Sequence, residues 1–118
     1  EQYEIKESAA EELLNDKRLN RKIICIGTTT LRALETCFKS NTPKLSGVTS
    51  LFIKRGFNYK FANGLITNFH APKSSLLAII DSLLEDNWLE IYEYALNSGL
   101  SFLSFGDSMY IDIDKCRI

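Results

Sequence analysis

Apolar and polar residues alternate along this chain in blocks that predict strands and helices in turn. Lys22–Ile26 is an apolar run rich in β-branched residues, which is typical of a buried and often parallel strand. After it, Leu31, Leu34 and Phe38 recur at the spacing of one helix face. This part of the chain therefore predicts a strand, a tight turn at Gly27 and a helix.

A short strand and a short helix are expected before that unit. Glu1–Ile5 predicts the strand, and the apolar residues among positions 9–14 fit one face of the helix. Ser8 stands three residues before Glu11, which is the spacing of a capping box. We therefore expect Ser8 to begin this helix.

The middle of the chain predicts a loop followed by strands. Asn41–Gly47 has the composition of a loop. Ser50–Phe61 alternates and is rich in aromatic residues, which predicts one or two strands with Gly56 as a turn or bulge between them. Leu65–Phe69 predicts a further short strand.

Two helices and two strands are expected in the last part of the chain. Pro72 opens a helix over about Ser74–Leu84, and a second helix over Trp88–Asn97 ends at a Ser-Gly carboxyl cap. Leu100–Phe105 predicts an apolar strand, and Met109–Ile113 predicts a strand at a sheet edge. The whole alternation predicts an α/β fold with a partial mixed, largely parallel sheet and flanking helices.

Composition limits the class of protein. The 118 residues, 45% hydrophobic and 25% charged, suit a single portion of a domain over 1–118. A formal net charge of −1 does not by itself suggest nucleic acid, because dedicated binders are usually basic. No apolar run reaches the roughly 20 residues that span a bilayer. The three cysteines lack metal-site spacing, so we expect free thiols and a cytoplasmic protein.

The first segment with candidate chemistry is Gly27–Glu35, which leaves the predicted strand and enters a helix. A helix start presents backbone N–H groups and a positive dipole end, which suit a phosphate or carboxylate. Thr28, Thr29, Arg32 and Glu35 are therefore candidate substrate-binding residues. The alternative is that the threonines only cap the helix and that Arg32 pairs with Glu35 on its surface.

The second segment, Thr67–Ser75, gathers a carboxamide, an imidazole, an ammonium group and hydroxyls within nine residues. His70 is the only histidine, and its ordinary pKa lies near neutrality, so it is a candidate for proton transfer. Asn68 and Ser74 are candidate binding residues beside it. The alternative is that His70 fixes the loop and that Ser74 caps the next helix.

Two further patterns are weaker. Asp107 follows a glycine after the predicted strand 100–105 and could anchor a ribose diol or orient a base; the alternative is a turn aspartate that binds its own backbone. Lys54, Arg55 and Lys60 interleave with aromatic residues, which could hold an RNA backbone and stack bases. A solvated surface is the alternative for this basic group.

Three of these segments, in this order, resemble the motifs of the S-adenosylmethionine:tRNA ribosyltransferase-isomerase family of queuosine biosynthesis. Gly27–Glu35 is similar to the family's Gly-Thr-Thr-Ser-Val-Arg-x-Leu-Glu. Thr67–Ser75 is similar to Thr-Asn-Phe-His-Leu-Pro-(Lys/Glu)-Ser-Thr, with departures at Ala71 and Ser75. The segment 102–109 resembles Phe-Phe-Ser-Tyr-Gly-Asp-Ala-Met. The resemblance covers nearly the whole chain.

The resemblance implies a function. Family members transfer and isomerise the ribosyl moiety of S-adenosylmethionine onto 7-aminomethyl-7-deazaguanine in the tRNA wobble position, giving epoxyqueuosine and releasing adenine and methionine. It implies His70 and Asp107 as catalytic residues, with S-adenosylmethionine as a substrate and no cofactor or metal. The implied partners are that tRNA and S-adenosylmethionine, with no membrane and a monomeric state.

The resemblance also implies that this chain is only a carboxyl-terminal portion. Family members are much longer and contain an amino-terminal region and an inserted β-barrel that this chain lacks, so we expect it to be inactive alone. Leu100-Ser101 stands where the family has Tyr-Arg, which removes a possible phosphate contact. The competing interpretation is a noncatalytic nucleotide- or RNA-binding α/β module derived from the same family.

Overall fold

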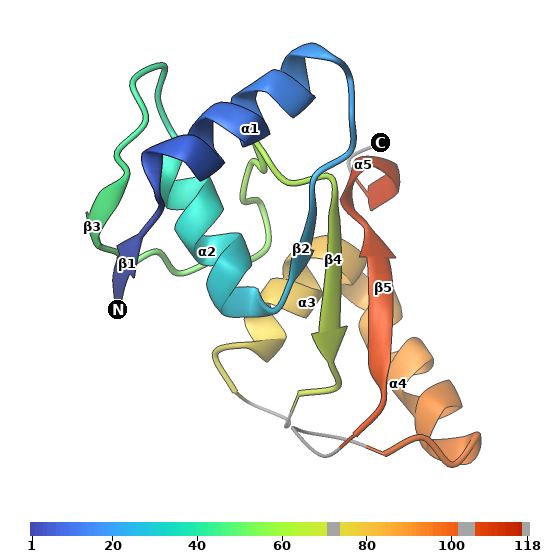
Figure 1. Cartoon of the computed structure of the whole chain (residues 1–118). Coiled ribbons are helices and arrows are strands. Elements are labelled where there is room, and N and C mark those ends of the chain that lie inside the picture. The colour runs from blue at the N-terminus through green and yellow to red at the C-terminus, as the bar shows by residue number, and fades with distance from the viewer. Residues whose placement is uncertain (71–73, 102–105, 117–118) are drawn as a thin grey trace.

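The computed structural model describes residues 1–70, 74–101 and 106–116. Figure 1 shows the arrangement of the strands and helices. In chain order the elements are β1 (Gln2–Glu4), α1 (Glu7–Arg18), β2 (Ile24–Ile26), α2 (Thr28–Cys37), β3 (Ser46–Val48), β4 (Gly64–Asn68), α3 (Leu77–Leu84), η1 (Glu85–Asn87), α4 (Trp88–Asn97), β5 (Ser108–Asp112) and α5 (Ile113–Cys116).

The central sheet has the strand order β2-β4-β5. Strands β2 and β4 run parallel, with Cys25 opposite Leu65, while β5 pairs antiparallel with β4, with Ile111 opposite Leu65. A separate antiparallel pair joins β1 to β3. The predicted α/β fold with a mixed sheet is therefore confirmed; the described central sheet contains one parallel and one antiparallel pairing.

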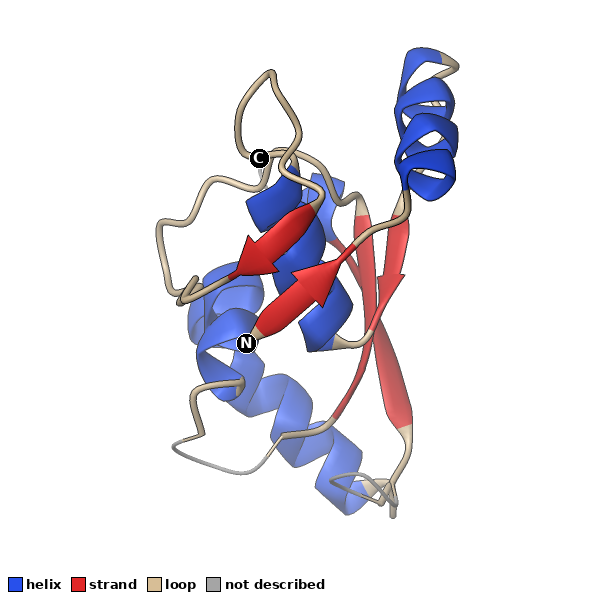
Figure 2. Ribbon diagram, turned by 60° about the vertical axis from the view of Figure 1, so that its left-hand side comes forward, coloured by secondary structure: helices blue, strands red, loops and turns tan. Residues whose placement is uncertain are grey.

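Helices cover one face of the central sheet. Cys25, Leu65 and Ile111 point to that face and are buried. On the opposite face Ile24 and Ile26 are 47% and 73% exposed. Figure 2 shows most helices gathered on one side of this sheet, with one helix standing apart. The apolar run that predicted a buried strand is thus buried on alternate residues only.

The core joins the sheet to α2, α3 and α5. Leu31 of α2, Leu65 of β4, Ile80 of α3 and Ile113 of α5 have no exposed surface. Each fully buried aliphatic side chain contributes about 1.5–3 kcal/mol through removal from water. This packing fixes the start of α2 against the ends of β2 and β4, where the candidate residues lie.

Most of the predicted elements are confirmed, with small shifts. β1, β2, β4, β5 and α4 lie where the sequence pattern predicts them, and Gly99 follows α4 with a φ of +79°. The helix predicted over 74–84 begins at Leu77. Pro72 and most of the strand predicted over 100–105 lie outside the described residues; Leu100 and Ser101 are described and are not in a strand.

Three expectations were wrong. Helix α1 begins at Glu7 without a side-chain cap, so Ser8 lies inside the helix. No strand occurs within 50–61, although Gly56 does form a turn there. β3 falls at the end of the predicted loop. Residues 50–61 lack a neighbouring strand, and side chains from other elements bind this segment instead.

The expected free thiols are confirmed. Cys25 and Cys37 are buried and Cys116 is half-buried, and none forms a disulfide. Desolvation, with a smaller effect of the nearby Glu35 carboxylate, raises the pKa of Cys25 to about 12. Its thiol is therefore protonated and unreactive at neutral pH. Within the described residues, no helix has the length and hydropathy needed to traverse a membrane.

Candidate substrate cleft

The candidate cleft forms at the carboxyl ends of β2 and β4. Because these strands are parallel, their carboxyl ends meet at one edge of the sheet, the usual place for a ligand in an α/β fold. The Gly27 amide donates to the Ile66 carbonyl at 2.8 Å, which extends the pairing by one residue. Gly27 then turns the chain into α2.

Gly27 has φ +93° and ψ 150°, a backbone conformation that residues other than glycine rarely adopt. A Cβ built there meets no atom within 4 Å, so the constraint comes from the backbone alone.

We expect Gly27→Ala to lower the free energy of unfolding by about 1–3 kcal/mol, because alanine must adopt this strained conformation. Urea denaturation followed by circular dichroism measures the change. Because the added methyl has open space, a loss below about 0.5 kcal/mol would show that the turn relaxes and is not strained.

Four of the predicted residues come together in the cleft. It has a volume of about 300 Å³ and lies between the start of α2 and the end of β4. Thr28, Thr29, Asn68 and His70 all line it. The remaining lining residues are Ile26, Gly27, Thr30, Ile66, Thr67 and Ser108.

The start of α2 forms one wall of the cleft. No side chain caps this helix, so the threonines do not act as the predicted caps. Thr28 is buried, whereas the Thr29 and Thr30 side chains are exposed. Backbone N–H groups of a first turn carry a partial positive charge, which favours a carboxylate or phosphate oxygen at this position.

His70 is held on both sides. Its Nε2 and Thr67 Oγ1 share a hydrogen bond of 2.9 Å, and its backbone N–H donates to the Tyr92 hydroxyl at 3.1 Å. Burial lowers the pKa of the imidazole below its usual value. His70 is therefore neutral at pH 7 and is positioned to accept a proton or to donate one hydrogen bond.

Asn68 connects the cleft to β5. The Ser108 hydroxyl donates to Asn68 Oδ1 at 3.1 Å, which fixes the orientation of the carboxamide. Neither Ser108 nor Thr67 was a named candidate in the sequence, although both belong to the motif segments. The signal that could have identified Thr67 is its spacing of three residues from His70.

Arg32 and Glu35 do not line this cleft. The Arg32 guanidinium pairs with Glu1 at 2.8 Å. Glu35 is 4% exposed, and its carboxylate accepts hydrogen bonds from the amides of residues 60–62 at 2.7–3.0 Å. The alternative of a surface pair between Arg32 and Glu35 is therefore wrong, and their role in substrate binding stays a prediction.

Ser74 and Asp107 also lie outside the lining, and both accept hydrogen bonds from backbone amides. The Ser74 hydroxyl accepts from the Leu77 amide at 3.2 Å, at the start of α3. Asp107 Oδ2 accepts from the Ser101 amide at 2.9 Å. A substrate contact by Ser74 and a catalytic role of Asp107 stay predictions.

Only some of the basic and aromatic side chains at 54–61 are exposed for contact with RNA. The Arg55 guanidinium donates to Asp81 at 2.7 Å and to Asp86 at 3.1 Å, and these hydrogen bonds raise its pKa. Tyr59 and Phe61 are buried. Base stacking on Tyr59 and Phe61 was therefore wrong, whereas Lys54, Arg55 and Lys60 are exposed and their contact with RNA stays a prediction.

No metal centre appears in the part of the chain that the structure describes. Across residues 1–70, 74–101 and 106–116, no three His, Cys, Asp or Glu side chains are placed to hold a metal ion. The cleft instead offers hydroxyls, a carboxamide, an imidazole and backbone amides. These groups bind polar organic substrates and oxyanions.

The fold and the cleft define an α/β protein with a polar cleft at the carboxyl edge of parallel strands, next to a helix start. The sequence profile described as "Queuosine biosynthesis protein" matches residues 1–111. The chain belongs to this family.

Named relatives agree with this assignment. The chain is 39% identical to the S-adenosylmethionine:tRNA ribosyltransferase-isomerase of Prochlorococcus marinus strain MIT 9215, covering 94% of this chain and 31% of that protein. It is 43% identical to the same-named protein of Carboxydothermus hydrogenoformans, covering 94% and 33%. The crystal structure of S-adenosylmethionine tRNA ribosyltransferase from Thermotoga maritima matches with a TM-score of 0.85 and 34% identity, covering 93% of this chain and 39% of that one. The chain thus spans about a third of the length of these relatives.

Proposed function

We propose that the protein containing this chain transfers and isomerises the ribosyl moiety of S-adenosylmethionine onto 7-aminomethyl-7-deazaguanine in the tRNA wobble position. The products are epoxyqueuosine in the tRNA, adenine and methionine. The main support for this proposal is that Thr28, Thr29, Asn68 and His70 line one cleft in a chain of this family. S-adenosylmethionine is then a substrate, and the reaction uses no metal or further cofactor.

The cleft offers groups for the main chemical needs of this reaction. The methionine carboxylate of S-adenosylmethionine suits the positive start of α2, with the Thr29 hydroxyl as an added donor. The Asn68 carboxamide suits the ribose hydroxyls, because it both donates and accepts. The target base must leave its stack to reach such a cleft.

His70 is assigned to proton transfer at the ribosyl group. A C–H bond beside the sulfonium must break, and a neutral imidazole can accept that proton. The lowered pKa of His70 favours the neutral ring, so it does not start the reaction as a charged acid. Thr67 keeps the ring oriented through its hydroxyl.

The remaining two thirds of the protein complete the site in this proposal. The whole protein is expected to be a cytoplasmic monomer whose partners are S-adenosylmethionine and the tRNA. The 118-residue chain alone is expected to release no adenine.

The test mixes the whole protein with S-adenosylmethionine and tRNA that carries 7-aminomethyl-7-deazaguanine, and measures adenine by liquid chromatography. Adenine release that requires both substrates supports the proposal. Binding of both substrates without release supports the noncatalytic module instead. Absence of binding to either substrate contradicts both functions.

A further inference from the structure

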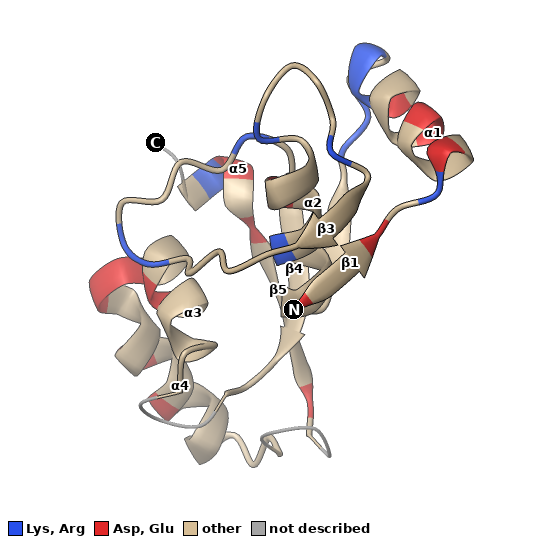
Figure 3. Ribbon diagram, turned by 90° about the vertical axis from the view of Figure 1, so that its left-hand side faces the viewer, with Lys and Arg blue, Asp and Glu red and all other residues tan. Residues whose placement is uncertain are grey.

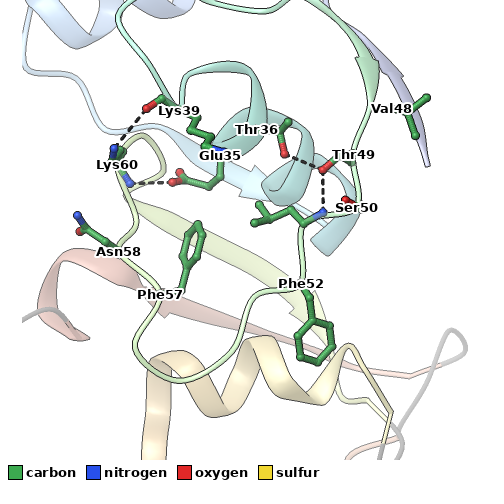
Figure 4. A pocket seen from close by; sticks show the side chains of 11 residues that line it. Glu35, Thr36, Lys39, Val48, Thr49, Ser50, Phe52, Phe57, Asn58 and Lys60 are labelled. Atoms are coloured by element: carbon green, nitrogen blue, oxygen red, sulfur yellow. Dashed lines mark hydrogen bonds between the residues drawn. The ribbon is translucent and has the colours of Figure 1, made fainter.

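A second and larger pocket lies at the other end of α2. It has a volume of about 590 Å³, within the range of about 300–1,000 Å³ typical of ligand sites. Its walls are the last turns of α2, the end of β3 and the loop 49–60 (Figure 4). It shares no lining residue with the cleft at Gly27–Thr30.

Specific hydrogen bonds build the upper wall of this pocket. The Thr36 and Thr49 hydroxyls bond each other at 2.8 Å, and Thr49 Oγ1 also accepts from the Leu51 amide at 3.1 Å. The Glu35 carboxylate accepts from the Lys60 amide at 2.7 Å (Figure 4). These contacts fix both ends of the loop to α2.

The far side of the loop is fixed to α3. The Tyr59 and Ser82 hydroxyls lie 2.6 Å apart, and Arg55 pairs with Asp81 at 2.7 Å. The loop therefore holds its shape without strand pairing, because side chains anchor it on two helices. A pocket held in this way is preformed, which lowers the entropic cost of binding a ligand.

The exposed groups around the pocket combine aromatic rings with ammonium groups. The Phe52 side chain is 56% exposed, and Phe57 is half-buried with its ring edge-on to Tyr59. Lys39 and Lys60 are exposed, and Lys60 Nζ donates to the Lys39 carbonyl at 3.3 Å. Figure 3 shows basic residues recurring on the loops of the side that faces the viewer.

We propose that this pocket binds one nucleotide of single-stranded RNA, with the base against Phe52 and Phe57 and the phosphate beside Lys39 and Lys60. Aromatic rings accept any base by stacking, and lysines hold the backbone. The Glu35 carboxylate is buried and faces the amides of residues 60–62, so the exposed charges at the pocket are those of Lys39 and Lys60.

The position of the pocket favours a polymer over a free nucleotide. From Thr28 in the cleft to Thr36 in the pocket, α2 rises about 12 Å, eight residues at ~1.5 Å each. A short single-stranded segment can span that distance with its modified base in the cleft. That the bound RNA is the tRNA substrate rests on the proposed function; binding of single-stranded RNA in this pocket does not.

The test compares Phe52→Ala and Lys39→Gln in the whole protein, using fluorescence anisotropy with a short, labelled, unmodified single-stranded RNA. Loss of one stacked base is expected to weaken binding by about fivefold or more. Loss of one phosphate contact is expected to reduce the slope of log affinity against log salt by about 0.7. Phe52→Tyr, which keeps the ring, is expected to retain affinity.

Matched controls lie elsewhere on the surface. Tyr94→Ala removes a ring on α4 that is 73% exposed, and Lys115→Gln removes a charge on α5. Both are expected to leave RNA affinity unchanged. Equal losses for Phe52→Ala and Tyr94→Ala, or no loss for Phe52→Ala, overturn the proposal.

A calorimetric titration with S-adenosylmethionine separates this inference from the proposed function. Phe52→Ala is expected to leave that affinity unchanged, because Phe52 does not line the cleft. RNA binding that depends on Phe52 in a protein that releases no adenine supports the pocket and contradicts the proposed activity. Adenine release with RNA affinity indifferent to Phe52 supports the proposed activity and contradicts the pocket.

Discussion

Replacing His70 by alanine in the whole protein is expected to lower adenine release by at least about tenfold, the lower end of what a proton-transfer group contributes. The imidazole lines the cleft and is held by Thr67, so its removal leaves the departing proton without an acceptor. Affinity for S-adenosylmethionine should change less than turnover, because the start of α2 remains. Unchanged turnover would remove His70 from the mechanism.

The pH profile gives an independent check on the same group. Burial lowers the pKa of His70 from 6.5, so the ring stays neutral until the pH falls below that value. If the neutral ring is the active form, kcat/KM is constant near neutrality and falls on the acid side with a midpoint below 6.5. In His70→Ala this acid limb should disappear. A midpoint above 6.5 in the wild-type protein contradicts the assignment.

Replacing Glu35 by alanine is expected to lower the free energy of unfolding by about 3 kcal/mol or more, since three backbone amides lose their acceptor at about 1–3 kcal/mol each. The loop 60–62 leads directly into β4, so the loss should act on the central sheet. Urea denaturation of the whole protein, followed by near-ultraviolet circular dichroism, measures the change.

Glu11→Ala is the matched control for Glu35→Ala. Glu11 is exposed on α1, and its removal is expected to change stability by less than about 0.5 kcal/mol. Glu35→Gln should fall between the two, because one oxygen is kept as an acceptor. If Glu35→Ala and Glu11→Ala unfold with equal free energies, water binds the amides of residues 60–62 as well as the Glu35 carboxylate does, and the expectation is wrong.

The sequence predicted the cleft better than it predicted the loop. Periodicity alone placed β2, α2 and β4 close to their observed positions, and parallel strands bring Thr29 and His70 to one edge. Local chemistry therefore identified four of the residues that line the cleft. Arg32 and Glu35 were grouped with them because helical spacing does not tell which tertiary partner a charge meets.

The segment 50–61 shows why an alternating pattern can mislead. Its buried residues Ile53, Tyr59 and Phe61 alternate with exposed ones, as in a strand. Its backbone, however, bonds to the side chain of Glu35 rather than to a neighbouring strand. No local signal reveals such a distant acceptor. The pocket beside it could therefore not be predicted from the sequence.

A crystal structure of the whole protein with S-adenosylmethionine most directly tests the proposed binding of this substrate in the cleft at the start of α2. We expect electron density for the ligand in contact with Thr28, Thr29, Asn68 and His70. Density instead between Phe52 and Lys60, with the cleft empty, would contradict this proposal.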